Sequence, residues 1–284
     1  MIFKVADIDL GLFNESDREY SEEGGFPGFT CDDAPQAKYQ VRVEPVPARP
    51  SGNLVFDSEQ AWRLLDEEGR RILWISSLNF TPYLVGNFSS DYRNGEIFTT
   101  RSTRVAGKYI FPLGRPLGEL LMINLLGTGY GLMLHSCGVI DAECGIVFAG
   151  ISTAGKTTTA RLWNSLPGVR VVNDDRTILR KKDGQFRVYG TPWYGQGGIA
   201  LAEDAPLKKI FILKHAPFNQ AVRLTPARAA AALLVRTFPP LWSAEGMAFT
   251  LQFLEELCLT VPCYELGFVP NMSMVEYVRC LTTD

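Results

Sequence analysis

The sequence has few of the residues that metal and redox sites commonly use. Of its 284 residues only His135 and His215 are histidines, which excludes a histidine-rich metal site. Its six cysteines form no Cys-x-x-Cys pair, so the sequence contains no zinc or redox motif of that kind. We therefore expect free thiols in a reducing cytoplasm.

Long apolar runs are also missing. The longest uncharged run lies between Glu119 and His135, is interrupted by Asn124 and three glycines, and is shorter than the roughly 18–20 residues of a membrane span. The first residues lack the basic start, apolar core and cleavage site of a signal peptide. We expect a cytoplasmic protein without a membrane segment.

Charge of either sign is not in excess. The 28 Lys and Arg residues nearly balance the 31 Asp and Glu residues, and the net charge is −3. This balance argues against a broad basic face for nucleic acid. Hydrophobic residues make up 46% of the chain, which is enough to build a folded core of one large or two small domains.

Residues 1–114 have the pattern of a β-rich region. Tyr39, Val41 and Val43 alternate as in a half-buried strand, and Asn94-Gly95 is typical of a hairpin turn. The polar segment 14–23 is expected to be a loop. One short helix is predicted from Ser58 as its N-cap to Gly69.

Residues 115–284 instead alternate between predicted helices and strands, which indicates an α/β domain with a mixed sheet. Asp183-Gly184 predicts a hairpin turn, and Ser273 and Glu276 form a capping box for a last helix. The predicted helices are 117–125, 157–164, 226–235 and 245–258, and the predicted strands are 145–149, 169–172, 210–213 and 264–266.

The segment 150–157 matches G-x-x-x-x-G-K-[ST], the Walker A or P-loop pattern. Its glycines let backbone N–H groups turn toward phosphate oxygens, and the following helix points its positive end at the same anion. Lys156 is predicted to reach the β- and γ-phosphates of a nucleotide, and the Thr157 hydroxyl to bind Mg²⁺. The predicted nucleotide-binding residues are Gly150, Ser152, Thr153, Ala154, Gly155, Lys156, Thr157 and Thr158.

Two adjacent carboxylates, Asp174 and Asp175, follow the apolar strand 169–172. Neighbouring side chains on an extended strand point apart, so different roles are expected. One Asp would bind Mg²⁺, and the other would engage an acceptor hydroxyl as a base. We assign Mg²⁺ to Thr157 and Asp175 and leave open which Asp is the base.

His135 ends an apolar strand upstream of the motif. It is either a structural residue or a catalytic one that donates to a phosphate or orients a carboxylate. Two further segments stay open in the same way. The glycine-rich segment 189–198 is either a mobile lid or a structural loop. Lys208-Lys209 either faces phosphate or lies on a solvated strand edge.

Together, His135, the 150–157 motif and the Val-Val-Asn-Asp-Asp segment at 171–175 resemble the HPr kinase/phosphorylase and phosphoenolpyruvate-carboxykinase-like family. The resemblance extends to HPr-kinase-like proteins of peptide-modification clusters, including lasso-peptide kinases, which often carry the Gly-Thr-Pro-Trp found here at 190–193. It implies an HPr-kinase-like core with a mixed sheet over 115–284, and catalytic roles for His135, Lys156, Asp174 and Asp175. It also implies the possibility of a homo-oligomer.

The chain departs from the HPr kinase pattern at three places. Ser152-Thr153 replaces Ser-Gly, Thr158 replaces a Glu, and Arg187–Gly190 replaces Glu-Val-Arg-Gly. These departures argue against reverse phosphorylase activity and against HPr itself as the substrate.

The resemblance implies a kinase that uses ATP and Mg²⁺ to phosphorylate a hydroxyl group, most simply serine, on a peptide, protein or small molecule. The altered Arg187–Gly190 segment motivates an alternative, a non-catalytic nucleotide-binding sensor or partner protein. A carboxykinase that acts on a small acid is a third option, although no ligands for its second metal are evident.

Overall fold

Alternating apolar and polar residues give most of the first 100 residues an extended conformation in the computed structural model. The structure describes residues 1–14, 20, 24–46, 51–59, 61–77, 81–99, 104–105 and 108–281. It divides into two compact units, Met1–Thr128 and Gly129–Asp284, whereas the sequence suggested a boundary after residue 114. Most of the predicted loop 14–23 lies outside the described residues.

The first unit is built on a mixed sheet with the strand order β1-β2-β3-β8-β7-β6-β5-β4. β3 pairs in parallel with β2 and β8, and the other neighbours are antiparallel. The elements are β1 (Ile2–Val5), β2 (Ile8–Asn14), a 3-10 turn (Phe26–Phe29), β3 (Ala37–Val43), β4 (Asn53–Asp57), β5 (Trp62–Glu67), β6 (Arg70–Ser76), β7 (Pro82–Phe88), β8 (Asn94–Thr99), β9 (Arg104–Val105), β10 (Lys108–Tyr109) and α1 (Leu117–Leu125), after which a π-helical turn (Leu126–Tyr130) leads into the second unit.

Two predictions in this unit are wrong. The predicted helix 58–69 is instead the strand β5 and its turn into β6, in which Glu68 and Gly69 have φ values of 52° and 83°. Two consecutive positive φ values make the tight turn that suits twisted antiparallel strands. Asn94-Gly95 begins β8, and the hairpin turn lies before it in residues 89–93.

The second unit has a sheet in the order β12-β11-β14-β15-β16-β18-β17, with β13 beside β11. β12 also pairs in parallel with β16, so β12, β11, β14, β15 and β16 form a closed circuit of pairings. The elements are β11 (Leu132–Asp141), β12 (Cys144–Ala149), α2 (Lys156–Asn164), β13 (Arg170–Asn173), β14 (Arg176–Lys182), β15 (Gln185–Tyr189), β16 (Asp204–His215), β17 (Gln220–Arg223), α3 (Pro226–Leu234), α4 (Ala244–Thr260), β18 (Cys263–Phe268) and α5 (Met272–Cys280).

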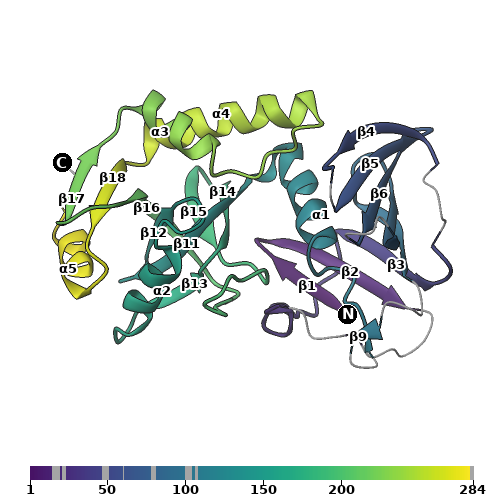
Figure 1. Cartoon of the computed structure of the whole chain (residues 1–284), viewed down its shortest axis with the longest axis horizontal. Coiled ribbons are helices and arrows are strands. Elements are labelled where there is room, and N and C mark those ends of the chain that lie inside the picture. The colour runs from purple at the N-terminus through teal and green to yellow at the C-terminus, as the bar shows by residue number, and fades with distance from the viewer. Residues whose placement is uncertain are drawn as a thin grey trace. The chain divides into compact units, whose positions relative to one another are not determined.

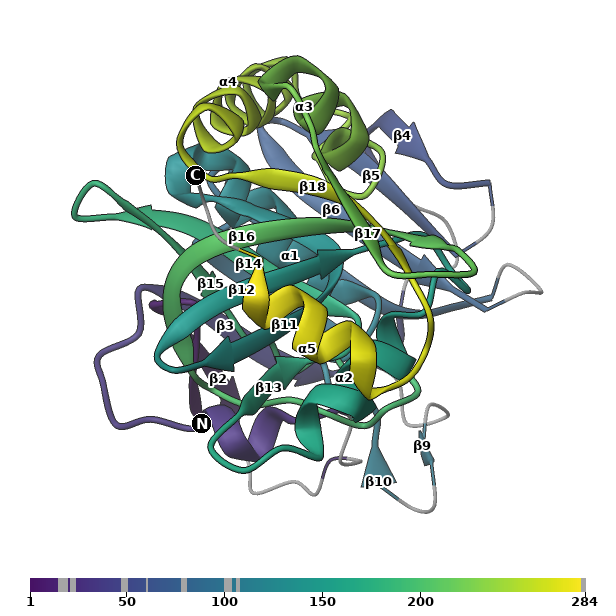
Figure 2. The same cartoon turned by 90° about the vertical axis from the view of Figure 1, so that its left-hand side faces the viewer.

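Helices cover both faces of this second sheet, which gives the α/β class expected from the sequence. One buried cluster joins the sheet to α3 and α4 (Figure 1), and it includes Leu134, Ile212 and Leu257. The other joins it to α2 and α5 (Figure 2), and it includes Phe148, Trp163 and Val275. The strands are therefore apolar on both faces, as expected for a sheet buried between helices.

The remaining elements follow their sequence signals closely, with one correction. Asn271, not Ser273, caps α5, because its side chain accepts the Ser273 N–H. Lys208-Lys209 lies where β16 has left β15, whose last partner is Pro206, and has not yet paired with β18, whose first partner is Ile210, so one side of β16 is unpaired here and Lys208 is exposed. Within the described residues, no helix combines the length and apolar character needed to cross a membrane.

Candidate active site

The loop between β12 and α2 turns sharply through two left-handed residues. Thr153 and Gly155 have φ values of 68° and 99°. Lys156 opens α2 and folds back, and its ammonium group donates to the carbonyls of Gly150 (2.9 Å) and Ile151 (3.1 Å). No side chain caps α2, so the positive end of the helix is open to an anion.

Phe268 and His215 support this loop from the ends of two neighbouring parallel strands. A Cβ atom on Gly155 would lie 2.6 Å from the Phe268 ring, so only glycine fits there. The His215 ring stacks on Phe268, and its Nε2 lies 2.9 Å from the Thr153 carbonyl. His215 must donate through Nε2 in this contact, because the carbonyl can only accept.

The end of β13 holds the glycine-rich segment in place. The Asn173 amide donates to the carbonyls of Thr191 (2.9 Å) and Trp193 (3.3 Å). Its Oδ1 accepts the N–H groups of Asp175 and Arg176, both at 2.7 Å. Asn173 therefore connects the two carboxylates to the segment 190–198.

Asp174 is completely buried and faces the same segment. Its two oxygens accept the N–H groups of Gly195 (2.9 Å) and Gly197 (2.7 Å). Side chains at these two positions would collide with the Asp pair, because an added Cβ would lie 2.7–2.8 Å from an Asp174 oxygen. The glycine-rich segment is thus held by hydrogen bonds at Gly195 and Gly197, as expected if it is a structural loop.

Asp175 faces the other way and is partly exposed. Its Oδ1 lies 2.9 Å from His135 Nε2, and its Oδ2 lies 2.6 Å from Arg176 Nη1. The Arg176 guanidinium also stacks on Phe238, at 4.3 Å from the ring centroid. The two carboxylates thus have different environments, as their alternation along the chain predicts.

His135 connects Asp175 with the 150–157 loop. Its carbonyl accepts the Gly150 N–H at 3.2 Å, while its imidazole contacts Asp175. The backbone N–H of Ser136 donates to the Asp175 carbonyl at 3.1 Å. β11 therefore fixes both halves of the candidate site.

Burial lowers the pKa of Lys156, and the charge of Asp175 partly offsets this effect. The buried ammonium is thus disfavoured in the absence of a second anion. A phosphate group would supply that anion.

The other loop residues named by the motif are placed as follows. Ser152 and Thr153 are exposed, Ala154 is buried, and Thr157 and Thr158 are half-buried in the first turn of α2. The Thr157 hydroxyl and the Asp175 carboxylate are the hard oxygen donors that Mg²⁺ prefers, so the donor set fits this ion.

Sequence reasoning assigned no role at this site to Arg176, His215 or Phe238. Arg176 directly follows the two carboxylates, and His215 ends an apolar strand just as His135 does, so each carried a local signal. Phe238 carried none, because it reaches His135 and Arg176 only through the return of the chain after α3.

Comparison with known proteins gives little direct guidance. No protein-family model matches the chain. No curated protein matches it in sequence. Among solved structures, the Hpr(Ser) kinase/phosphatase from Coxiella burnetii is similar, with 13% identity over 52% of this chain and 90% of that chain and a TM-score of 0.31. The side chains of the site, rather than this likeness, carry the function proposed below.

Proposed function

We propose that the chain is a kinase that transfers the γ-phosphoryl group of ATP, with Mg²⁺, to a hydroxyl group. The acceptor is a serine or similar alcohol on a peptide, a protein or a small molecule. The chain departs from the HPr kinase pattern at 152–153, 158 and 187–190, and these departures argue against HPr itself as the acceptor.

The observation that carries the proposal is the double role of His135. One residue binds the anion-ready loop through its backbone and the carboxylate of Asp175 through its imidazole. A phosphate held by the loop and a proton acceptor are thereby fixed to the same strand end. Phosphoryl transfer depends mainly on such positioning and on charge stabilisation.

The residues divide the work as follows. The loop amides and Lys156 bind the phosphates. Asp175 accepts the proton of the attacking hydroxyl, and His135 orients it by donating its Nε2–H. The Thr157 hydroxyl would hold Mg²⁺. The ion, when bound, neutralises charge on the transferring group. Asp174 holds the glycine-rich segment.

One observation favours the non-catalytic alternative. Both oxygens of Asp175 already have partners, His135 and Arg176, so the carboxylate is not free in this arrangement. In a nucleotide sensor this network would persist after ATP binds. In a kinase Arg176 would release Asp175, and its guanidinium would be available to the phosphates.

The test compares binding with turnover. The wild-type chain and Lys156→Ala are titrated calorimetrically with Mg²⁺ and a non-hydrolysable ATP analogue, and are then incubated with radiolabelled ATP and serine-containing peptides. The kinase predicts binding and label transfer, both lost in Lys156→Ala and retained in Lys38→Ala, an exposed lysine of β3. Binding without transfer to any acceptor would favour the sensor, and no binding would exclude both.

A further inference from the structure

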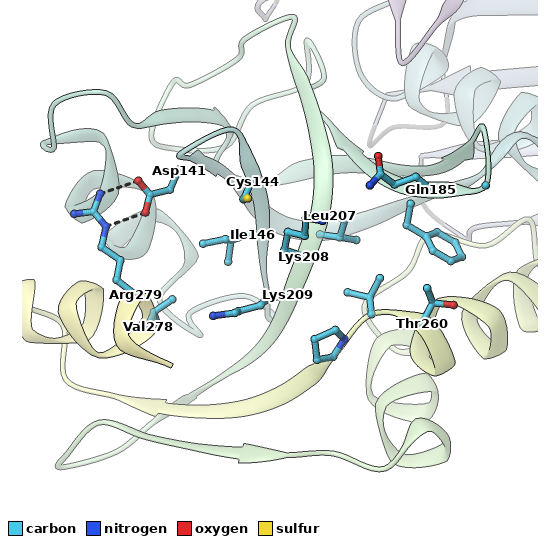
Figure 3. A pocket seen from close by; sticks show the side chains of 14 residues that line it. Asp141, Cys144, Ile146, Gln185, Leu207, Lys208, Lys209, Thr260, Val278 and Arg279 are labelled. Atoms are coloured by element: carbon cyan, nitrogen blue, oxygen red, sulfur yellow. Dashed lines mark hydrogen bonds and ion pairs between the residues drawn. The ribbon is translucent and has the colours of Figure 1, made fainter. Parts of the chain in front are cut away.

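A pocket of about 670 Å³ lies in the second unit (Figure 3). It is lined by Cys144 and Ile146 near the start of β12, whereas the loop follows the last residue of that strand. Its volume falls in the range of small-molecule sites. No residue of the proposed kinase site lines it, so a ligand bound here would be different from the nucleotide and the acceptor.

The walls of the pocket combine apolar and polar side chains. They come from two strands, the hairpin after β14, the end of α4 and the end of α5. The apolar lining residues are Ile146, Phe186, Leu207, Val261, Pro262 and Val278. Transfer of an apolar group from water to these side chains would favour its binding, because apolar surface is removed from water.

A β-bulge places a lysine at this site. Gly145 of β12 pairs with Leu207, but the next residue, Ile146, pairs with Lys209, so Lys208 is the extra residue. Bulges redirect side chains and occur often beside binding sites. Lys208 is exposed, and no described acidic residue pairs with it.

The charged lining residues leave an excess of positive charge. Arg279 donates two hydrogen bonds to Asp141, both at 2.8 Å, and this pair is neutral overall. Lys209 donates to the carbonyl of Leu281, which carries no charge. Figure 3 shows Lys209 between β16 and Val278 of α5, with its amine on the α5 side. Among the described residues, Lys208 and Lys209 therefore remain as two cations without an acidic partner.

Two helix ends limit how much negative charge the pocket can accept. α4 ends at the lining residue Thr260, and α5 ends at Cys280, next to Arg279. The carboxyl end of a helix carries about half a negative charge, which partly offsets the two lysines. The pocket also has no helix N-terminus or glycine loop to hold a phosphate group. These features favour one carboxylate over a phosphate or polyphosphate.

We propose that this pocket binds a small organic monoanion, a carboxylate on an apolar body. The carboxylate pairs with Lys208 and Lys209, and the apolar body packs between Ile146, Leu207 and Val278. The site is separate from the candidate kinase site, and its occupancy does not require that the chain be a kinase.

The test is calorimetric titration of the full chain with decanoate, kept below its critical micelle concentration. The comparison ligands are 1-decanol, which lacks the charge, acetate, which lacks the apolar body, and AMP, which carries a phosphate. The variants are the double substitution Lys208→Gln/Lys209→Gln, and Lys38→Gln as a control lysine of β3. Circular dichroism and thermal unfolding check that each variant folds.

We expect decanoate to saturate one site and to bind more tightly than the other three ligands. The double variant should weaken decanoate about tenfold, the loss of two partly exposed charge pairs, while Lys38→Gln leaves it unchanged. If the double variant misfolds, 0.5 M salt should weaken decanoate binding to the wild type by several-fold. Equal binding of decanol, tighter binding of AMP, or no saturable binding of decanoate would overturn the proposal.

Discussion

Asp174 and Asp175 are neighbours in the chain, but the structure gives their carboxylates different work. Asp174 is buried under two backbone N–H groups of the glycine-rich segment. Asp175 is partly exposed between His135 and Arg176. An Asp-Asp pair at a strand end therefore does not imply two equivalent catalytic groups.

Replacing Asp175 with Asn should remove the proposed proton acceptor and keep the fold. We expect phosphoryl transfer to fall by about 100-fold or more, with ATP binding retained, because general-base catalysis contributes factors of this size. Steady-state kinetics and calorimetric titration measure the two quantities.

The matched variant is Asp174→Asn. Its amide can accept only one of the two glycine N–H bonds, so the free energy of unfolding should fall by about 1–3 kcal/mol in urea denaturation. Full transfer by Asp175→Asn, beside a stable but inactive Asp174→Asn, would reverse the two roles.

His215 should act on nucleotide binding rather than on the chemical step. Removing the ring in His215→Ala frees the Thr153 carbonyl, and the left-handed turn of the loop loses its support. We expect KM for ATP to rise several-fold with little change in kcat, the pattern of lost ground-state binding.

Lys214→Ala is the control, because Lys214 precedes His215 and pairs with Glu265. A fall in kcat at constant KM in His215→Ala would contradict the positioning role.

At the scale of elements, the turn before α2 depends on a glycine that Phe268 crowds. In Gly155→Ala the new Cβ would clash with this buried ring. The alanine would also have to adopt the left-handed φ that Gly155 has here. We expect the free energy of unfolding to fall by more than about 1 kcal/mol and ATP binding to be lost.

Gly168→Ala separates the two causes, since Gly168 has a φ of 75° with open space around it. It should show the backbone penalty, about 1 kcal/mol, with normal ATP binding. Equal ATP affinity in both variants would show that the Phe268 contact does not shape the loop.

The elements of the second unit could be predicted well because their signals are local. Asp183-Gly184 marks the β14–β15 turn, and Pro226 opens α3. In the first unit, Trp62, Leu64 and Leu65 fit a helical spacing as well as a strand, and the turn that decides between them is Glu68-Gly69. Glu-Gly is a weaker turn signal than Asp-Gly, so the sequence favoured the wrong element there.

In the candidate site, too, the parts with a local sequence signal could be predicted and the contacts between distant segments could not. The loop motif and both carboxylates lie on contiguous segments, so the sequence shows them directly. The structure adds which carboxylate meets His135, and that depends on the pairing of β11 with β14, in which His135 lies opposite Arg176. The contacts of Phe238 and His215 join distant segments, and no local pattern marks such pairs.

At the scale of the whole molecule, the candidate site should reduce stability when no ligand is bound. Burial lowers the pKa of Lys156 in the folded state, so the folded chain holds this proton less tightly than the unfolded chain. The unfavourable contribution is complete below the lowered pKa and disappears as the pH rises to the ordinary lysine value.

Lys156→Met should therefore raise the urea midpoint of the ligand-free protein at pH 7, and this gain should shrink as the pH rises toward 10. Lys38→Met, at an exposed site, should change the midpoint little at either pH. A gain for Lys156→Met that grows with pH would contradict the assigned direction. Mg²⁺-ATP should reverse the order at pH 7, because only the wild type gains binding energy.

The two contacts of His135 have a consequence for how such a site can change over evolution. The backbone carbonyl of His135 accepts the Gly150 N–H, so a substitution that keeps the backbone conformation of β11 preserves this bond. Its bond to Asp175 runs through the imidazole and disappears with it. On the proposed function, one substitution at this position would remove the group that orients Asp175 and keep the backbone bond to the 150–157 loop. The proposed kinase and the alternative nucleotide sensor would then differ by as little as one mutation.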